Sequence, residues 1–177
     1  MKKLLVFTLI AVLLAGCAAG GSVKTGLGHV ISINKSKDAT ADAEGLAQVY
    51  TVMAAVTFDK AGKILGVKID TAQVKVNFDQ NGKITTDLNE EQETKVELGD
   101  RYGMKKNSGI GREWYEQIAE LEKWMIGKTV DQVNSMKTVK KDDAHPAVPD
   151  EADLKSKVTI TVNDYQAAVT EAFENAK

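Results

Sequence analysis

The fold is decided by Val56-Thr57-Phe58-Asp59-Lys60-Ala61-Gly62-Lys63-Ile64, which returns twenty residues later as Val76-Asn77-Phe78-Asp79-Gln80-Asn81-Gly82-Lys83-Ile84. In both copies, apolar and polar residues alternate up to an Asp, and a Gly follows three residues after that Asp. An aspartate side chain can bond the amides of a tight turn, and glycine readily adopts a positive φ. Each copy therefore predicts a hairpin turn, at residues 59–62 and 79–82.

The same alternation extends on both sides of the two turns. It predicts strands at residues 48–58, 63–70, 73–78 and 83–87, and a further strand over the alternating residues 29–33. Strands that follow one another through short turns pair as neighbours, so the centre of the chain is expected to be an antiparallel meander.

Helical periodicity replaces this alternation after Gly111. Apolar residues recur at helical spacing and form one stripe, namely Trp114, Ile118, Leu121 and Met125. Gly127 is expected to end this helix, and Thr129 to cap a short second one that reaches about Met136.

The last third of the chain predicts a connector, a strand and a final helix. Residues 140–153 hold both prolines and many charges, which is typical of an exposed connector. Val158, Ile160 and Val162 alternate with threonines as in a strand, and Asn163 or Thr161 could cap the helix that follows. That helix would turn these residues inward: Tyr165, Ala168, Val169, Ala172 and Phe173. Strands first and helices afterwards predict an α+β fold, a single domain with an antiparallel meander and two or three packed helices.

Composition excludes several classes of function. The chain has 177 residues, 23 Lys plus Arg against 25 Asp plus Glu, and a single cysteine, Cys17. The absence of a basic surplus argues against nucleic acid as a partner. One cysteine allows neither an intrachain disulfide nor a cysteine-rich metal cluster.

Neither catalytic residues nor a metal site can be predicted from the motifs. The two turn copies lack the alternating oxygen ligands and the closing Glu of a calcium loop. His29 and His145, the two histidines, have no metal-ligand or catalytic spacing. Ser108 lacks the Gly-x-Ser-x-Gly setting of a nucleophile elbow.

The first residues predict export and lipidation. Met1-Lys2-Lys3 is a basic start, a short apolar run covers residues 4–14, and Leu14-Ala15-Gly16-Cys17 resembles a bacterial lipobox. The resemblance implies cleavage of a signal peptide at residues 1–16 and lipid attachment at Cys17, with residues 17–28 as the lipidated cysteine and flexible tether. Two or more acyl chains hold a protein stably on a membrane. We therefore expect a lipid-anchored protein on the extracytoplasmic face of the bacterial cell membrane, with residues 29–177 as its folded domain.

Several weaker motifs follow one another in a recognisable order. The hairpin precedes Glu93-Thr94-Lys95-Val96-Glu97-Leu98-Gly99-Asp100, then Trp124-Met125-Ile126-Gly127-Lys128, and finally Asp153-Leu154-Lys155-Ser156-Lys157-Val158-Thr159. This order resembles bacterial FMN-binding domains of extracytoplasmic electron-transfer proteins. The chain as a whole resembles a lipoprotein branch of that family from Gram-positive anaerobes.

The resemblance implies FMN as a cofactor, carried as a phosphoester on a threonine. In the family's Asp-x-x-Ser/Thr-Gly-Ala-Thr motif, the matching positions here are Asp153, Ser156 and Thr159. Lys157 and Val158 replace the Gly-Ala pair, and a glycine lets the backbone approach a phosphate closely. We therefore do not expect covalent FMN at Thr159.

Two functions remain open at the level of sequence. The first is a membrane-anchored domain that holds flavin for electron transfer with a redox partner, in which the flavin supplies the redox chemistry. The alternative is a flavin-free ligand-binding or interaction module at the cell surface. An enzyme that uses its own catalytic side chains is less favoured, because no acid–base or nucleophile arrangement is present.

Overall fold

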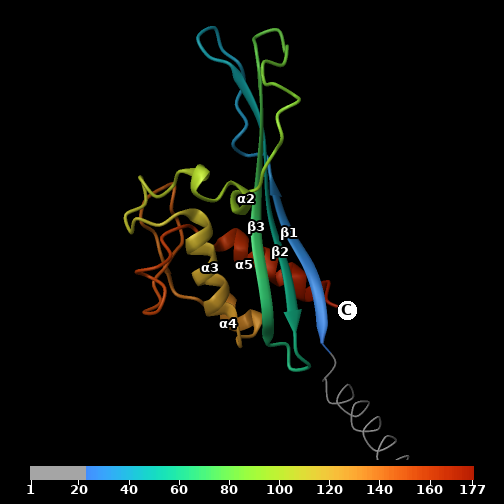
Figure 1. The fold of residues 1–177 in the computed structure, drawn as a ribbon, viewed down its shortest axis with the longest axis vertical. Coiled ribbons are helices and arrows are strands. Elements are labelled where there is room, and N and C mark those ends of the chain that lie inside the picture. The colour runs from blue at the N-terminus through green and yellow to red at the C-terminus, as the bar shows by residue number, and fades with distance from the viewer. Residues whose placement is uncertain (1–22) are drawn as a thin grey trace, which may run out of the picture.

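A computed structural model describes residues 23–177 of the chain as one α+β domain (Figure 1). The element order is β1 (Lys24–Ser32), β2 (Gly45–Phe58), β3 (Ile64–Phe78), α2 (Lys95–Leu98), the 3-10 helix η1 (Gly99–Tyr102), α3 (Trp114–Met125), α4 (Val130–Asn134), β4 (Thr138–Val139), β5 (Val148–Pro149) and α5 (Asn163–Glu174). The expected signal peptide and Cys17 lie outside the described residues. None of the helices within residues 23–177 has the length and apolar character needed to cross a membrane.

The first three strands form the predicted meander, in the order β1-β2-β3 with both pairs antiparallel. β3 is one continuous strand where the sequence predicted two, because residues 71 and 72 keep their pairing with β2. β1 begins at Lys24, so residues 24–28, expected in the tether, belong to the sheet.

The two predicted turns are confirmed and have the same geometry. In the first, Asp59 Oδ1 accepts hydrogen bonds from the amides of residues 61 and 63 at 2.9 and 2.8 Å, and Gly62 has a φ of 76°. In the second, Asp79 Oδ1 accepts from residues 81 and 83 at 2.8 and 2.9 Å, and Gly82 has a φ of 77°. The repeat therefore encodes one turn twice.

The strand predicted at residues 83–87 does not form. After the second turn, only a single bridge joins Phe78 to Ile84, and the Asn77 amide is bonded by the Thr86 hydroxyl at 2.8 Å. A side chain thus takes the donor that a further strand would need, and the chain leaves the sheet.

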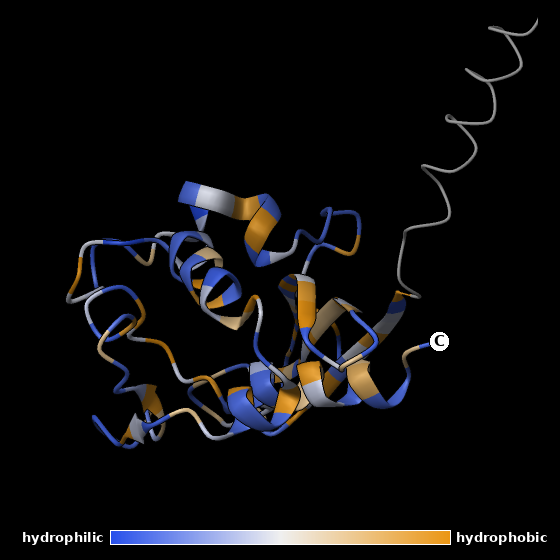
Figure 2. Ribbon diagram, turned by 90° about the horizontal axis from the view of Figure 1, so that it is seen from below, coloured by the Kyte–Doolittle hydropathy of each residue, from blue (hydrophilic) through white to orange (hydrophobic). Residues whose placement is uncertain are grey.

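One face of the sheet carries the core, while its other face keeps several large apolar side chains exposed. Val52, Ala54 and Val56 of β2 are almost completely buried with Ile69 of β3. Leu27 and Ile31 of β1, Val49 of β2 and Leu65 of β3 are exposed. Figure 2, seen from below, shows that the helices carry both hydrophobic and hydrophilic residues, as packing on one side requires.

α5 crosses behind the strands in Figure 1 and packs on β1 and β2. Its contact with β1 is very close, because an ideal Cβ at Gly26 would lie 1.8 Å from the Ala172 carbonyl oxygen, and one at Gly28 would lie 2.0 Å from that of Ala168. Glycines on the strand and alanines on the helix thus let the two backbones meet.

The helix predicted from Trp114 to Met125 and the short helix capped by Thr129 are both confirmed. Thr129 Oγ1 accepts a hydrogen bond from the Gln132 amide, and Gln132 Oε1 accepts one from the Thr129 amide at 3.0 Å. This reciprocal pairing is a capping box. Gly127, with a φ of 79°, follows the end of α3 as expected.

The last third of the chain differs from the prediction in three respects. Val158, Ile160 and Val162 are buried, but this segment forms no strand. The residue before α5 is Val162, with no side-chain cap from either Thr161 or Asn163. Phe173 is 45% exposed and packs its ring edge against Phe58, with ring centroids 5.1 Å apart. The alternating apolar residues are buried, but the strand predicted from them is wrong.

The connector at 140–153 is also less exposed than predicted. Ala147 and Val148 are buried, and Val148 and Pro149 form β5, which pairs with β4. The Val162 amide donates to the Ala147 carbonyl at 3.0 Å. The connector therefore packs against the residues that immediately precede α5.

The close contact between β1 and α5 generates a stability prediction. Gly28→Ala should lower the free energy of unfolding by about 3 kcal/mol, because the new methyl group meets helix backbone that cannot move independently. Gly66→Ala is the matched control, since a Cβ at this strand glycine meets nothing within 4 Å. Urea unfolding of the two variants checks this, and equal stabilities would contradict the close packing.

Candidate functional site

A cavity of about 700 Å³ lies between the sheet and the helical part of the chain. The sheet contributes residues such as Tyr50 and Gln73, and the other walls come from α2, η1, α3, the start of α5 and the loop before α5. Its lining includes four aromatic side chains, Tyr50, Tyr102, Trp114 and Tyr165, and the side chain of Lys95. Pockets of about 300–1,000 Å³ with aromatic walls and a few polar groups are the usual form of small-molecule sites. This is the leading candidate site in the described part of the chain.

Lys95 is the distinctive residue of this cavity. It is only 7% exposed, and its Nζ lies 5.1, 4.9 and 5.3 Å from the ring centroids of Tyr50, Tyr102 and Trp114. Among residues 23–177, no hydrogen bond or ion pair reaches this ammonium group. Three aromatic faces stabilise the cation in place of a carboxylate.

Burial changes the acidity of the groups around the cavity. Loss of hydration lowers the pKa of Lys95 from 10.5 to about 8, an effect that Lys35 adds to and Asp70 opposes. Burial also raises the pKa of Tyr50 and Tyr102, and raises that of Tyr165 well above its usual value. Near neutral pH the cavity thus has one buried cation among neutral phenols.

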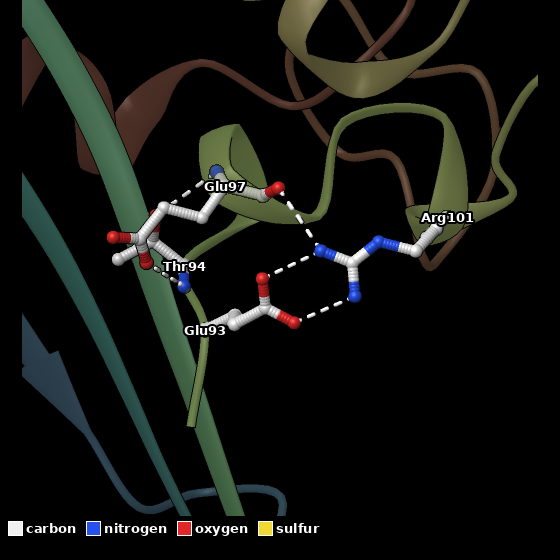
Figure 3. A network of polar contacts seen from close by, with 4 residues as sticks. All are labelled: Glu93, Thr94, Glu97 and Arg101. Carbon is white, nitrogen blue, oxygen red and sulfur yellow. Dashed lines mark hydrogen bonds and ion pairs between the residues drawn. The ribbon is translucent and has the colours of Figure 1, made fainter. Parts of the chain in front are cut away.

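Neighbours of Lys95 in the sequence form a polar network, and Figure 3 shows four of them: Glu93, Thr94, Glu97 and Arg101. Thr94 and Glu97 form a capping box around α2, in which the Thr94 amide donates to Glu97 Oε2 at 2.8 Å. Arg101 of η1 forms a bidentate pair with Glu93, at 2.6 and 2.5 Å, and also donates to the Glu97 carbonyl at 3.3 Å. The contacts of Glu93, Thr94, Glu97 and Arg101 form a clamp. This clamp joins α2, which carries Lys95, to η1, which carries Tyr102.

The sheet holds this clamp in place. Asp70 Oδ1 on β3 accepts a hydrogen bond from the Val96 amide at 3.2 Å, and a bridge pairs Ala72 with Thr94. Lys95 therefore begins a helix that is attached directly to the edge of the sheet.

Two of the aromatic side chains that line the cavity, Trp114 and Tyr165, come from α3 and α5. Trp114 and Tyr165 are 1% and 3% exposed, and Trp114 Nε1 donates to the Tyr165 hydroxyl at 3.0 Å. Trp114 follows Glu113, whose buried carboxylate accepts from the amides of Met104 and Lys105 at 2.8 and 3.0 Å. The loop before α3 is thereby fixed beside the cavity.

The three residues matched to the flavin motif lie apart from this lining. Asp153 and Ser156 are exposed in a turn, and Thr159 is partly buried. The Thr159 amide and hydroxyl both donate to Gln117 Oε1, at 2.8 and 3.3 Å. Lys157, which replaces the family's glycine, forms an ion pair with Glu120 at 3.3 Å. The segment is thus bound to α3, and the residues that follow Thr159, Ile160 and Thr161, line the cavity.

The two histidines each pair with a carboxylate. His29 Nδ1 lies 3.2 Å from Glu171 Oε2, and His145 Nδ1 lies 2.8 Å from Asp142 Oδ1. Within residues 23–177 there is no group of three or more His, Cys, Asp or Glu side chains that could hold a metal ion.

Lys95 was missed as a site residue at the level of sequence. It stands inside the motif 93–100, but its partners come from β2, η1 and α3, far apart along the chain. The Thr-x-x-Glu capping box at 94–97 was the local signal that a helix begins there.

No protein-family model matches the chain, and no solved structure matches it. Among curated proteins, a chlorophenol reductase from Desulfitobacterium hafniense is 32% identical over 108 residues. The match covers 55% of this chain and 33% of that protein, so the chain spans about a third of the length of its curated relative.

The buried ammonium group predicts an unusual dependence of stability on pH. Below pH 8 Lys95 is protonated in both states, and its burial costs at most about 3 kcal/mol. Between pH 8 and 10.5 the unfolded chain binds the proton and the native protein does not, so stability rises with pH. Lys95→Met packs against the same rings without a charge.

The variant should therefore unfold at higher urea concentration than the wild type at pH 7, and the difference should shrink toward pH 10.5. Groups that titrate in both proteins cancel in this comparison. A difference that is constant with pH would contradict a lowered pKa for Lys95.

Proposed function

We propose that this protein is an extracytoplasmic lipoprotein, anchored on the membrane through Cys17, whose cavity holds a flat aromatic small molecule for electron transfer, with FMN as the first candidate. The observation that carries the proposal is the cavity itself, in which a buried lysine stands among aromatic rings. Flat ring systems gain from contact with aromatic faces, and a nearby cation favours a ring that becomes more negative on reduction.

The curated relative supports a redox role. Its name describes a reductase that acts on a chlorophenol, which is itself a flat aromatic molecule. The match is confined to a third of that protein, so only the association with reduction supports the proposal.

The residues present fit a flavin ring held without a covalent bond better than a phosphoester on Thr159. Tyr50 and Tyr102, which are partly exposed, offer apolar contact for the ring, and Lys95 offers a positive charge. Thr159 instead gives both its amide and its hydroxyl to Gln117. FMN would supply electron transfer, while the protein would bind the ring, orient it and set its electrostatic surroundings.

The second candidate is a flavin-free ligand-binding or interaction module at the cell surface. It is favoured by the replacement of the Gly-Ala pair with Lys157 and Val158, and by the ion pair that Lys157 makes with Glu120. Both candidates use the same membrane anchor and the same cavity, so the bound molecule decides between them. A redox partner belongs only to the first candidate.

Anchoring is tested at Cys17. Radiolabelled fatty acid should be incorporated into the wild type and not into Cys17→Ser, and the mature wild-type chain should begin at residue 17. Incorporation that persists in the variant, or a different mature terminus, would refute the lipoprotein assignment.

Flavin binding is tested by titrating purified protein with FMN and following flavin fluorescence. Tyr102→Ala should weaken binding about tenfold, because one ring face of the cavity is lost. Tyr115→Ala is the matched control, since Tyr115 bonds Asp100 and does not line the cavity.

The mode of attachment is read from intact mass after co-expression with a flavin transferase. The wild type should gain no FMN mass. One FMN that is lost in Thr159→Ala would instead establish a covalent carrier, whereas no binding in either experiment would favour the flavin-free module.

A further inference from the structure

The ammonium group of Lys95 is a buried charge whose surroundings are known from every side. The groups that face it or lie near it are Tyr50 on β2, Asp70 and Lys75 on β3, Tyr102 on η1, Asp164 and Tyr165 on α5, Lys35 after β1, and Asp143 and His145 in the loop after β4. Among these described groups, none forms an ion pair or hydrogen bond with Lys95.

A buried cation without an anionic partner is a costly arrangement. Removing an ammonium group from water is unfavourable, and an oxyanion placed against it would recover much of that cost. The cavity on which this group borders is large enough for a small molecule and is open to solvent. An anionic ligand is therefore the missing partner that the geometry favours.

The surrounding rings restrict the shape of such an anion. Tyr50, Tyr102 and Trp114 each place a ring about 5 Å from Lys95 Nζ. An anion that reaches the ammonium group must lie among these rings, where a planar aromatic molecule gains contact and a hydrated inorganic ion loses its water.

The charged groups of the lining restrict where the anionic oxygen binds. Asp143 and Asp164 line the cavity together with Lys35, and Asp143 is itself paired with Lys140 at 2.7 Å. An oxyanion placed beside Asp143 or Asp164 would be repelled, whereas one directed at Lys95 is attracted.

We propose that the cavity selects planar aromatic molecules carrying one ring-conjugated oxyanion, and that Lys95 binds this oxygen. This inference rests on the proposed function, because it names the ligand class of the same cavity. A phenolate and the anionic ring of a reduced flavin share this chemistry.

The test compares two probes that differ by one methyl group. 2,4-Dinitrophenol is ionised throughout the neutral and alkaline range, and its methyl ether, 2,4-dinitroanisole, is never ionised. Calorimetry at pH 7 should give at least about tenfold tighter binding of the phenolate, the effect of one charge-assisted hydrogen bond. Lys95→Met should abolish this preference, and Lys95→Arg should keep it.

Lys75→Met is the matched control. Lys75 is an exposed lysine near the cavity that does not line it, so the preference for the phenolate should survive its replacement. His145→Asn separates any contribution of the histidine at the rim.

The pH profile of the wild type is a second measurement that needs no Lys95 variant to fold. Phenolate affinity should be level at neutral pH and fall above about pH 8 as free Lys95 loses its proton, by up to tenfold per pH unit. Affinity for the ether should not change, because the pKa values of Tyr50, Tyr102 and Tyr165 are all raised.

The outcomes separate this inference from the function on which it rests. Equal binding of phenolate and ether, or a phenolate preference that persists in Lys95→Met, would overturn the inference. If neither probe binds while FMN does, the inference falls and the proposed function stands. If neither probe nor FMN binds, both fall.

Discussion

The rest of the structure depends on the hydrogen bonds that the backbone of β3 makes along its outer edge. An edge strand presents backbone groups that must find partners, and here the helical half of the chain supplies them. The Ile69 amide donates to Glu122 Oε1 at 2.8 Å, the Ile64 amide donates to the Lys128 carbonyl at 2.8 Å, and a bridge pairs Ala72 with Thr94. These contacts fix where α2, α3 and α4 lie, and the cavity forms in the angle between them and the sheet.

The same edge also shows how far the sequence could predict the sheet. The two Asp-x-x-Gly turns were predictable because their hydrogen bonds are local, within residues 59–63 and 79–83. The strand at 83–87 was not, because its formation depends on which group takes the backbone donors at the end of β3. The Thr86 hydroxyl accepts the Asn77 amide, and the chain turns away after one bridge.

Burial and pairing are separable properties, as the segment before α5 demonstrates. Its alternation predicted a strand, yet Val158, Ile160 and Val162 are buried without forming one. The site is a still stronger case. Lys95 meets rings from β2, η1 and α3, and no local pattern encodes such a convergence. Sequence could predict the capping box that begins its helix, while the enclosure of the ammonium group arises from tertiary packing.

The segment that matches the flavin motif also positions part of the cavity wall. Lys157 pairs with Glu120, and Thr159 is bonded to Gln117, so this segment lies against α3. The residues beyond it, Ile160 and Thr161, are thereby placed in the cavity wall. A covalently attached ligand is retained whatever its affinity, whereas a ligand held by contacts alone needs a source of binding free energy. Under the function we propose, Lys95 provides that source, because an oxyanion bound against this buried ammonium group would offset the cost of its burial.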